Sequence, residues 1–124
     1  MGKIKVFIID DNVAARTMLS NMINTQDDME VVGQGGSGQS SVPLIGDTQP
    51  DVALLEIETG DVIAINDIMA QIKAVDPKIH VVICASPNAG DLITPMNEIG
   101  AEDFIRKPYN RFNLFRTIRN VMSK

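Results

Sequence analysis

The stretch "PDVALLEIETG" (residues 50–60) decides the fold, because it reads as a buried strand that ends in acidic side chains. Residues 52–57 are apolar except for Glu56, without the polar alternation of a strand that has one face in water. Continuous apolar runs of this length are typical of strands covered on both faces, as in parallel sheets. We therefore predict a strand over 52–57 with the carboxylate of Glu56 near its carboxyl end.

Four more strands and three clear helices follow from similar patterns. Apolar, β-prone runs predict strands over 3–9, 29–33, 79–85 and 103–106. Apolar residues recur at helical spacing over 15–23, 65–72 and 114–122. Asp11 or Asn12 can cap the first of these helices, and Asn110 can cap the last.

Two segments give weaker signals. Residues 34–41 are rich in Gly and Ser and predict a flexible loop, and residues 42–49 predict only a short helix because Pro43 fits a first turn. Within residues 86–103, Pro95 interrupts the pattern, so any helix there is short or begins late.

Strands that alternate with helices predict a parallel sheet covered on both faces. Right-handed crossovers then favour an α/β doubly wound, flavodoxin-like sandwich with strand order 2-1-3-4-5. We expect five parallel strands and five helices in a single domain over residues 1–124, because this length suits one core.

Composition limits the function. The net charge of −5 makes nucleic-acid binding an unfavourable hypothesis, and the basic residues of 106–124 are interpreted as a solvated helix face. No apolar run is long enough to cross a membrane, and no leader is visible, so we expect a cytoplasmic protein. Cys84, the one cysteine, lies in an apolar run and is expected to be a buried, inert thiol. His80, the one histidine, is expected to be a surface or strand-edge residue.

Acidic and basic side chains follow several of the predicted strands. Asp10 and Asp11 follow the first strand, Glu56 ends the third, and Lys107 follows the fifth. In a parallel sheet these ends meet at one edge, where ligands bind. Two carboxylates, with Glu56 and the backbone carbonyl of Glu58, could hold Mg²⁺ there, and Lys107 would balance the remaining charge. The alternative is structural: capping by the aspartates and a simple Glu56–Lys107 ion pair.

Four motifs, in order and at matching spacing, resemble the receiver domains of two-component response regulators. They are "VFIIDDN" (6–12), "QPDVALLEI" (49–57), "VVICAS" (81–86) and "GAEDFIRKPYN" (100–110). The resemblance spans the whole chain. It implies a signalling module that is not itself an enzyme and that acts through a protein partner.

The resemblance also implies roles for single residues. Asp11 corresponds to a metal ligand with Asp10 as its partner, and Lys107 to the lysine that contacts the phosphoryl group. Pro108 corresponds to the family's cis proline. Tyr109 corresponds to an aromatic switch, although a half-exposed ring beside the proline turn is an equal alternative.

Two positions depart from the family. Glu56 stands where the family has its phosphoacceptor Asp, and Ala85 stands at the position of the phosphate-contacting hydroxyl, with Ser86 one residue late. The extra methylene of Glu56 displaces the nucleophile, and a displacement of about 1 Å can lower a rate by about a hundredfold. We therefore expect a phosphorelay receiver that is independent of phosphorylation or locked, with Mg²⁺ weakened or absent if Glu56 fills the pocket.

The expected partner is a histidine kinase, a phosphotransfer protein or an effector. The predicted surface is formed by the fourth helix, the fifth strand and the last helix, as the resemblance implies, and a homodimer is left open. One alternative is a conventional Mg²⁺-dependent phosphoacceptor.

A second alternative is a nucleotide-binding domain, since Gly33, Gly35 and Gly38 match the spacing G-x-G-x-x-G and Glu58 lies about twenty residues further on. A short, proline-containing helix after these glycines argues against it.

Overall fold

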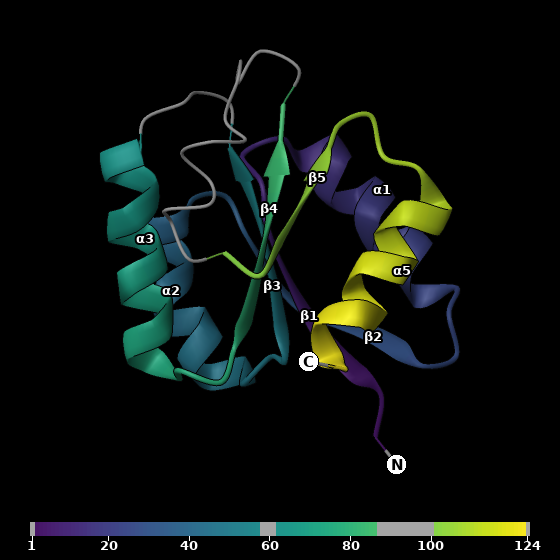
Figure 1. Cartoon of the computed structure of the whole chain (residues 1–124), viewed down its shortest axis with the longest axis horizontal. Helices are drawn as coiled ribbons and strands as arrows, with labels where there is room; N and C mark the ends of the chain where they lie inside the picture. Colours follow the sequence, from purple (N-terminus) through teal and green to yellow (C-terminus); the bar gives the residue numbers. More distant parts are fainter. Residues whose placement is uncertain (1, 58–61, 87–100, 124) are drawn as a thin grey trace.

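The fold is an open parallel sheet with helices on both faces (Figure 1). In this computed structural model, the structure describes residues 2–57, 62–86 and 101–123. The five strands are β1 (Ile4–Ile9), β2 (Met29–Gly35), β3 (Val52–Ile57), β4 (His80–Ala85) and β5 (Asp103–Arg106). They are all parallel in the order β2-β1-β3-β4-β5, which confirms the predicted flavodoxin-like topology.

The helices are α1 (Val13–Asn24), α2 (Gly38–Thr48), α3 (Val62–Val75) and α5 (Arg111–Met122). The described residues thus contain four helices rather than the predicted five. The remaining predicted helix, around Pro95, lies outside the described residues. No helix in the described ranges is long and apolar enough to cross a membrane.

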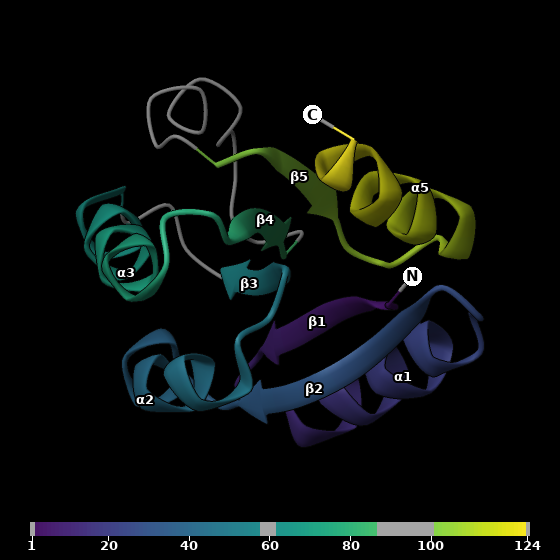
Figure 2. The same cartoon turned by 90° about the horizontal axis from the view of Figure 1, so that it is seen from below.

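Two apolar layers flank the sheet. The view along the strands shows one pair of helices on each face (Figure 2). On one face, α1 and α5 pack through residues such as Leu19, Ile23, Leu114 and Ile118. On the other face, α2 and α3 pack through Ile45, Ile65, Met69 and Ile72. Alternate strand residues serve the two layers, so each central strand is buried on both sides. This burial explains the continuous apolar runs in the sequence.

The caps of α1 and α5 are those that the sequence predicts. The side chain of Asn12 accepts a hydrogen bond from the backbone N–H of Ala15 at 3.0 Å. The side chain of Asn110 accepts from the N–H groups of Phe112 and Asn113 at 2.9 and 3.2 Å. Each cap satisfies N–H groups that have no acceptor inside the helix, and fixes where the helix begins.

The prediction for residues 34–49 was wrong. Strand β2 extends to Gly35, and α2 begins at Gly38, so there is no long loop and the helix is not short. Ser37 caps α2, since its hydroxyl accepts from the N–H of Ser40 at 3.1 Å. Pro43 therefore lies inside the helix, where it removes one backbone hydrogen bond. The cap at Ser37 and the packing of Ile45, which is fully buried, offset that loss.

The glycines of this segment are needed for close packing. A Cβ on Gly35 would lie 1.8 Å from Oγ of Ser41, and one on Gly38 would lie 2.5 Å from the side chain of Ile68. A Cβ on Gly33 would lie 2.7 Å from the ring of Phe7. All three approaches are too close for a real Cβ, so packing between β2, α2 and their neighbours accounts for the G-x-G-x-x-G spacing without a nucleotide.

Candidate functional site

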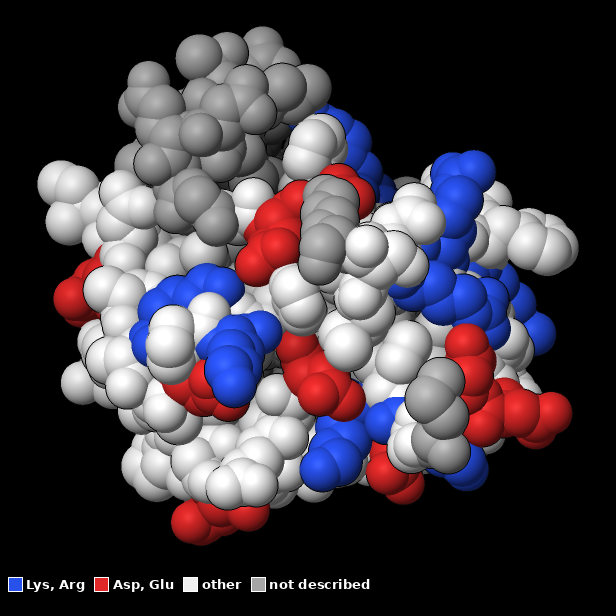
Figure 3. Space-filling view, turned by 60° about the horizontal axis from the view of Figure 1, so that its bottom comes forward, with Lys and Arg blue, Asp and Glu red and all other residues white. Residues whose placement is uncertain are grey.

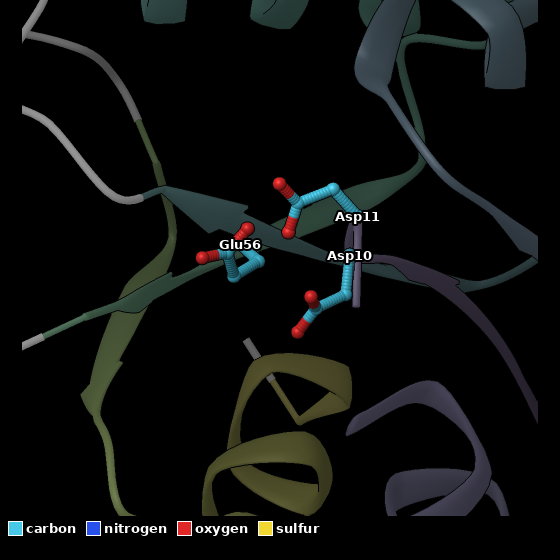
Figure 4. Close-up of side chains that lie close together, drawn as sticks. All are labelled: Asp10, Asp11 and Glu56. Atoms are coloured by element: carbon cyan, nitrogen blue, oxygen red, sulfur yellow. The ribbon is translucent and has the colours of Figure 1, made fainter. Parts of the chain in front are cut away.

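Three carboxylates meet at the carboxyl ends of β1 and β3. Ile9 is paired with Leu55 across these strands, and the residues that follow them, Asp10 and Glu56, lie close together. Asp10, Asp11 and Glu56 each offer an oxygen within 4.8 Å of the others. Figure 4 shows these side chains approaching one another from the two strand ends. The sequence prediction that these acids gather at one edge of the sheet is thus supported by their geometry.

The carboxylates differ in their surroundings. The side chain of Asp10 is 1% exposed and that of Glu56 is 7% exposed, whereas Asp11 is exposed. Burial of two negative charges side by side is unfavourable unless a cation or hydrogen-bond donors compensate them. Asp11, which reaches solvent, has no such requirement.

Lys107 supplies the compensating charge. Its Nζ donates to Oδ2 of Asp10 at 2.9 Å and lies 3.6 Å from Oε1 of Glu56. Burial alone would lower the pKa of Lys107, but the hydrogen bond to Asp10 and the nearby charge of Glu56 outweigh it, so that the pKa is raised. The lysine is therefore firmly protonated and bridges two acids of the cluster.

The turn between β1 and α1 holds Asp10 in place. Its backbone N–H donates to the carbonyl of Gly35 at 3.0 Å, and its Oδ1 accepts from the N–H of Asn12 at 2.9 Å. The guanidinium of Arg16 donates to its carbonyl oxygen. Sequence reasoning missed Arg16, because a single arginine one turn into a helix carries no signal that distinguishes it from a solvated residue.

Backbone hydrogen bonds join the residues at the carboxyl ends of β3, β4 and β5. The backbone N–H of Lys107 donates to the carbonyl of Ala85 at 2.8 Å, and that of Ser86 donates to the carbonyl of Ile57 at 2.9 Å. The side chain of Ala85 is packed in the layer of α2 and α3 and brings no hydroxyl to the edge. Glu58, whose carbonyl was predicted as a metal ligand, lies outside the described residues.

Tyr109 packs inward, against the layer formed by α1 and α5. Its ring centroid lies 5.7 Å from Nζ of Lys107, in the range of a cation–π contact. Its hydroxyl is buried beside the Cys84 thiol, and no nitrogen or oxygen of the described residues bonds to it. Burial and the neighbouring Cys84 raise the pKa of Tyr109.

The Lys107–Pro108 bond is cis, as the resemblance implies.

Cys84 itself is 1% exposed. Burial raises the pKa of this thiol to about 12, with smaller effects from its neighbours. A thiol with so high a pKa is not ionised at neutral pH and is a poor nucleophile. These observations support the prediction of an inert core residue.

A second charged group ties α3 to β4 and β5. Oε2 of Glu102 lies 2.9 Å from Nδ1 of His80, and Oε1 lies 3.3 Å from Nζ of Lys73, which also donates to the carbonyl of Ile79. Burial alone would raise the pKa of Glu102, but the hydrogen bond and charge of His80 and those of Lys73 lower it. His80 therefore takes part in a structural network at the opposite end of β4 from the acid cluster. The sequence gives no hint of this long-range contact.

The acid cluster has the chemistry of a site for a hard divalent cation. Carboxylate oxygens are the ligands that Mg²⁺ selects, and it usually keeps several waters beside one or two carboxylates. Asp10, Asp11 and Glu56 fit that donor set. Lys107 already neutralises part of their charge, which lowers the attraction for a cation.

Comparisons with known proteins agree with this arrangement. The family model of the response regulator receiver domain matches residues 6–119. The chemotaxis protein CheY of Listeria monocytogenes serovar 1/2a is 31% identical over 106 residues, which cover 86% of this chain and 87% of that protein. The response regulator domain of Thermotoga maritima CheB has a crystal structure with a TM-score of 0.80 and 26% identity, and 98% of each chain is covered.

Some relatives are much longer than this chain. The protein-glutamate methylesterase/protein-glutamine glutaminase 1 of Syntrophomonas wolfei is 29% identical over 114 residues. The match covers 92% of this chain but 32% of that relative, so the chain spans about a third of its length. With the sheet order, the acid cluster and the lysine after β5, these matches lead to one conclusion: the chain belongs to the response regulator receiver domain family of two-component signalling.

Proposed function

We propose that this receiver domain signals without the ordinary phosphorylation cycle, because Glu56 occupies the position of the phosphoacceptor. The observation that carries the proposal is the 3.6 Å distance between Oε1 of Glu56 and Nζ of Lys107. The glutamate places a negative group beside the lysine that would otherwise contact an incoming phosphoryl group. Lys107 and Glu56 then either imitate part of a phosphorylated site or close the pocket to an incoming phosphoryl group.

The imitation is incomplete. A phosphoryl group brings nearly two negative charges and three acceptor oxygens, whereas a carboxylate brings one charge and two oxygens. The extra methylene of Glu56 also moves its oxygens into the space that the transferred group needs. In-line phosphoryl transfer depends on placement, and an error of about 1 Å can lower the rate by about a hundredfold.

The same geometry supports weak cation binding. Lys107 bonds to Asp10 and lies near Glu56, so a cation must compete with an ammonium for two of the three carboxylates. We propose that Asp10 and Asp11 hold Mg²⁺ weakly in this protein, with Glu56 as a further ligand if its side chain turns outward.

The output is a protein–protein interaction rather than a reaction. We propose a cytoplasmic module that binds a histidine kinase, a phosphotransfer protein or an effector through the side formed by β5 and α5. The helix predicted before β5 would extend this surface and lies outside the described residues.

Hydrogen exchange tests the proposal of a fixed state. We expect the amides of β5 and of residues 107–110 to show the same protection with and without Mg²⁺ and beryllofluoride, a phosphoryl analogue. The Glu56→Asp variant, measured in parallel, should gain protection with both reagents. A clear change in the natural protein would contradict the fixed state.

A second candidate, a conventional phosphoacceptor, is supported by one observation: Asp10, Asp11 and Lys107 are all in place. In that case an acid of the cluster accepts the phosphoryl group despite the altered geometry. The intact mass after incubation with Mg²⁺ and acetyl phosphate distinguishes the two candidates, because only the second predicts a phosphoryl adduct on the natural protein.

A further inference from the structure

The basic residues of the last twenty positions are not alike. Arg119 is held by Asp28, with 2.8 and 2.9 Å separating the guanidinium nitrogens from the two carboxylate oxygens, and it also bonds Gln26. Arg106 and Arg116 are exposed, and no carboxylate of the described residues lies within ion-pair distance of either. Arg119 therefore has a structural partner, whereas these two arginines present uncompensated positive charge.

Arg106 and Arg116 line one groove between β5 and α5. The groove has a volume of about 360 Å³, and the polar residues that line it include Arg106, Asn110, Asn113, Arg116, Thr117 and Asn120. On α5, the spacing of 113, 116, 117 and 120 forms one polar stripe next to the buried face of that helix. The groove thus offers hydrogen-bonding groups as well as charge.

Nearby acids offset only part of this charge. Glu102 is paired with Lys73 and His80, and Asp28 is paired with Arg119. Among the described residues that line the groove, Asp103 is the one acid, and its carboxylate accepts a hydrogen bond from the backbone N–H of Phe104 at 2.8 Å. Its single negative charge therefore faces the two positive charges of Arg106 and Arg116. On the face of the molecule that Figure 3 shows, small groups of basic and acidic side chains lie next to one another.

Strand β5 forms one edge of the sheet. It pairs with β4 on one side, and no strand of the described residues pairs with its other side. An unpaired edge presents backbone N–H and C=O groups that an extended peptide can join. The groove that contains Arg106 and Arg116 is lined by all four residues of β5.

We propose that the groove between β5 and α5 binds an acidic, extended segment of a partner protein. The segment would place carboxylates near Arg106 and Arg116, and its backbone would run along the edge of β5. The net charge of −5 does not prevent this, because at physiological ionic strength charges more than about 8 Å away are largely screened. The proposal rests on the proposed function in taking the partner to be a protein that docks on the side formed by β5 and α5, and it does not depend on the role of Glu56.

The test uses the whole chain and a fluorescein-labelled peptide of alternating Val and Glu, with binding measured by fluorescence anisotropy. We expect binding that weakens as salt rises, since exposed charge pairs are screened. The double variant Arg106→Glu/Arg116→Glu should weaken binding by about tenfold, because two attractions become two repulsions. The matched control, Lys3→Glu/Lys78→Glu, changes the net charge equally at exposed sites elsewhere and should bind like the natural protein.

Two further measurements make the result decisive. Amide chemical shifts in the natural protein should change along β5 and on the polar stripe of α5 when the peptide is added. Circular dichroism shows that each variant is folded. Equal weakening by both double variants, equal affinity for a Val–Lys peptide, or equal competition by duplex DNA would each overturn the proposal. The Glu56→Asp variant should bind the peptide unchanged, so a failure here is separate from any failure of the proposed function.

Discussion

Nζ of Lys107 lies 2.9 Å from Oδ2 of Asp10, and this contact joins the residues that follow β1 and β5 across the carboxyl ends of β3 and β4. The carboxylate of Asp10 is almost fully buried, and Oε1 of Glu56 lies 3.6 Å from the same ammonium. The lysine is thus a structural cation as well as a candidate phosphate contact. Both roles depend on the same ammonium group of Lys107.

Replacing Lys107 should show how much its ion pairs stabilise the fold. In Lys107→Met, two buried carboxylates lose their cation, and we expect the free energy of unfolding at pH 7 to fall by about 2 kcal/mol. Urea unfolding measures this. Because the pKa of Lys107 is raised above 10.5, its contribution is fully present below pH 10.5 and is lost as the pH rises through the raised value.

Added Mg²⁺ should recover part of that loss, since a cation that binds only the folded state stabilises it. Lys78→Met, at an exposed lysine, is the control and should be near neutral. If the two variants have the same stability at pH 7, the ion pair with Asp10 does not stabilise the fold.

Gly35 should not tolerate a side chain. A Cβ there would lie 1.8 Å from Oγ of Ser41, so Gly35→Ala should lower the free energy of unfolding by about 1–3 kcal/mol. The matched control is Gly36→Ala, whose Cβ would meet Arg16 only at 3.7 Å. Thermal unfolding of the two variants checks this. Equal melting temperatures would contradict the packing explanation of the glycine motif.

Tyr109 allows a test of its buried hydroxyl. Because no nitrogen or oxygen of the described residues bonds to this hydroxyl, Tyr109→Phe should leave stability within about 0.5 kcal/mol or raise it slightly. Tyr109→Ala should lower stability by about 3 kcal/mol, since it leaves a cavity against the layer of α1 and α5. A loss of more than about 1 kcal/mol in Tyr109→Phe would instead indicate a hydrogen bond that holds the ring inward.

Glu102 should make stability depend on pH. Its pKa is lowered below 4.5 in the folded state, so its contribution is fully present above pH 4.5 and is lost as the pH falls through the lowered value. We expect Glu102→Gln to lower stability by about 0.5–1 kcal/mol at pH 7, through loss of the contacts with Lys73 and His80, and by less at pH 3. Denaturant unfolding at both pH values measures the difference. An equal effect at pH 7 and pH 3 would show that the charge of Glu102 is not what matters.

Much of the fold could be predicted because local patterns and the sheet agree. The strands over 52–57 and 103–106 have the bounds that the sequence predicts, since each short β-prone stretch is followed by polar or turn residues. The acids could be placed together because the carboxyl ends of parallel strands meet at one edge. Asp10 and Glu56 required no knowledge of side-chain packing to be singled out.

Other features depend on contacts between distant residues. The start of α2 was missed because Pro43 is unfavourable inside a helix, and only the cap at Ser37 and the burial of Ile45 reverse that preference. The pairing of His80 with Glu102 joins the start of β4 to the residue before β5, and no local pattern reports it. The contact of Arg16 with the carbonyl of Asp10 is likewise a product of the folded turn.

In the function that we propose, Glu56 prevents the ordinary phosphorylation of this receiver. The most direct measurement is the intact mass of the natural protein and of Glu56→Asp, side by side, after incubation with Mg²⁺ and acetyl phosphate. We predict no phosphoryl adduct on the natural protein and an adduct on the variant, because the shorter side chain returns the carboxylate to the position from which in-line transfer can occur. A phosphoryl adduct on the natural protein would contradict the claim and make it a conventional receiver.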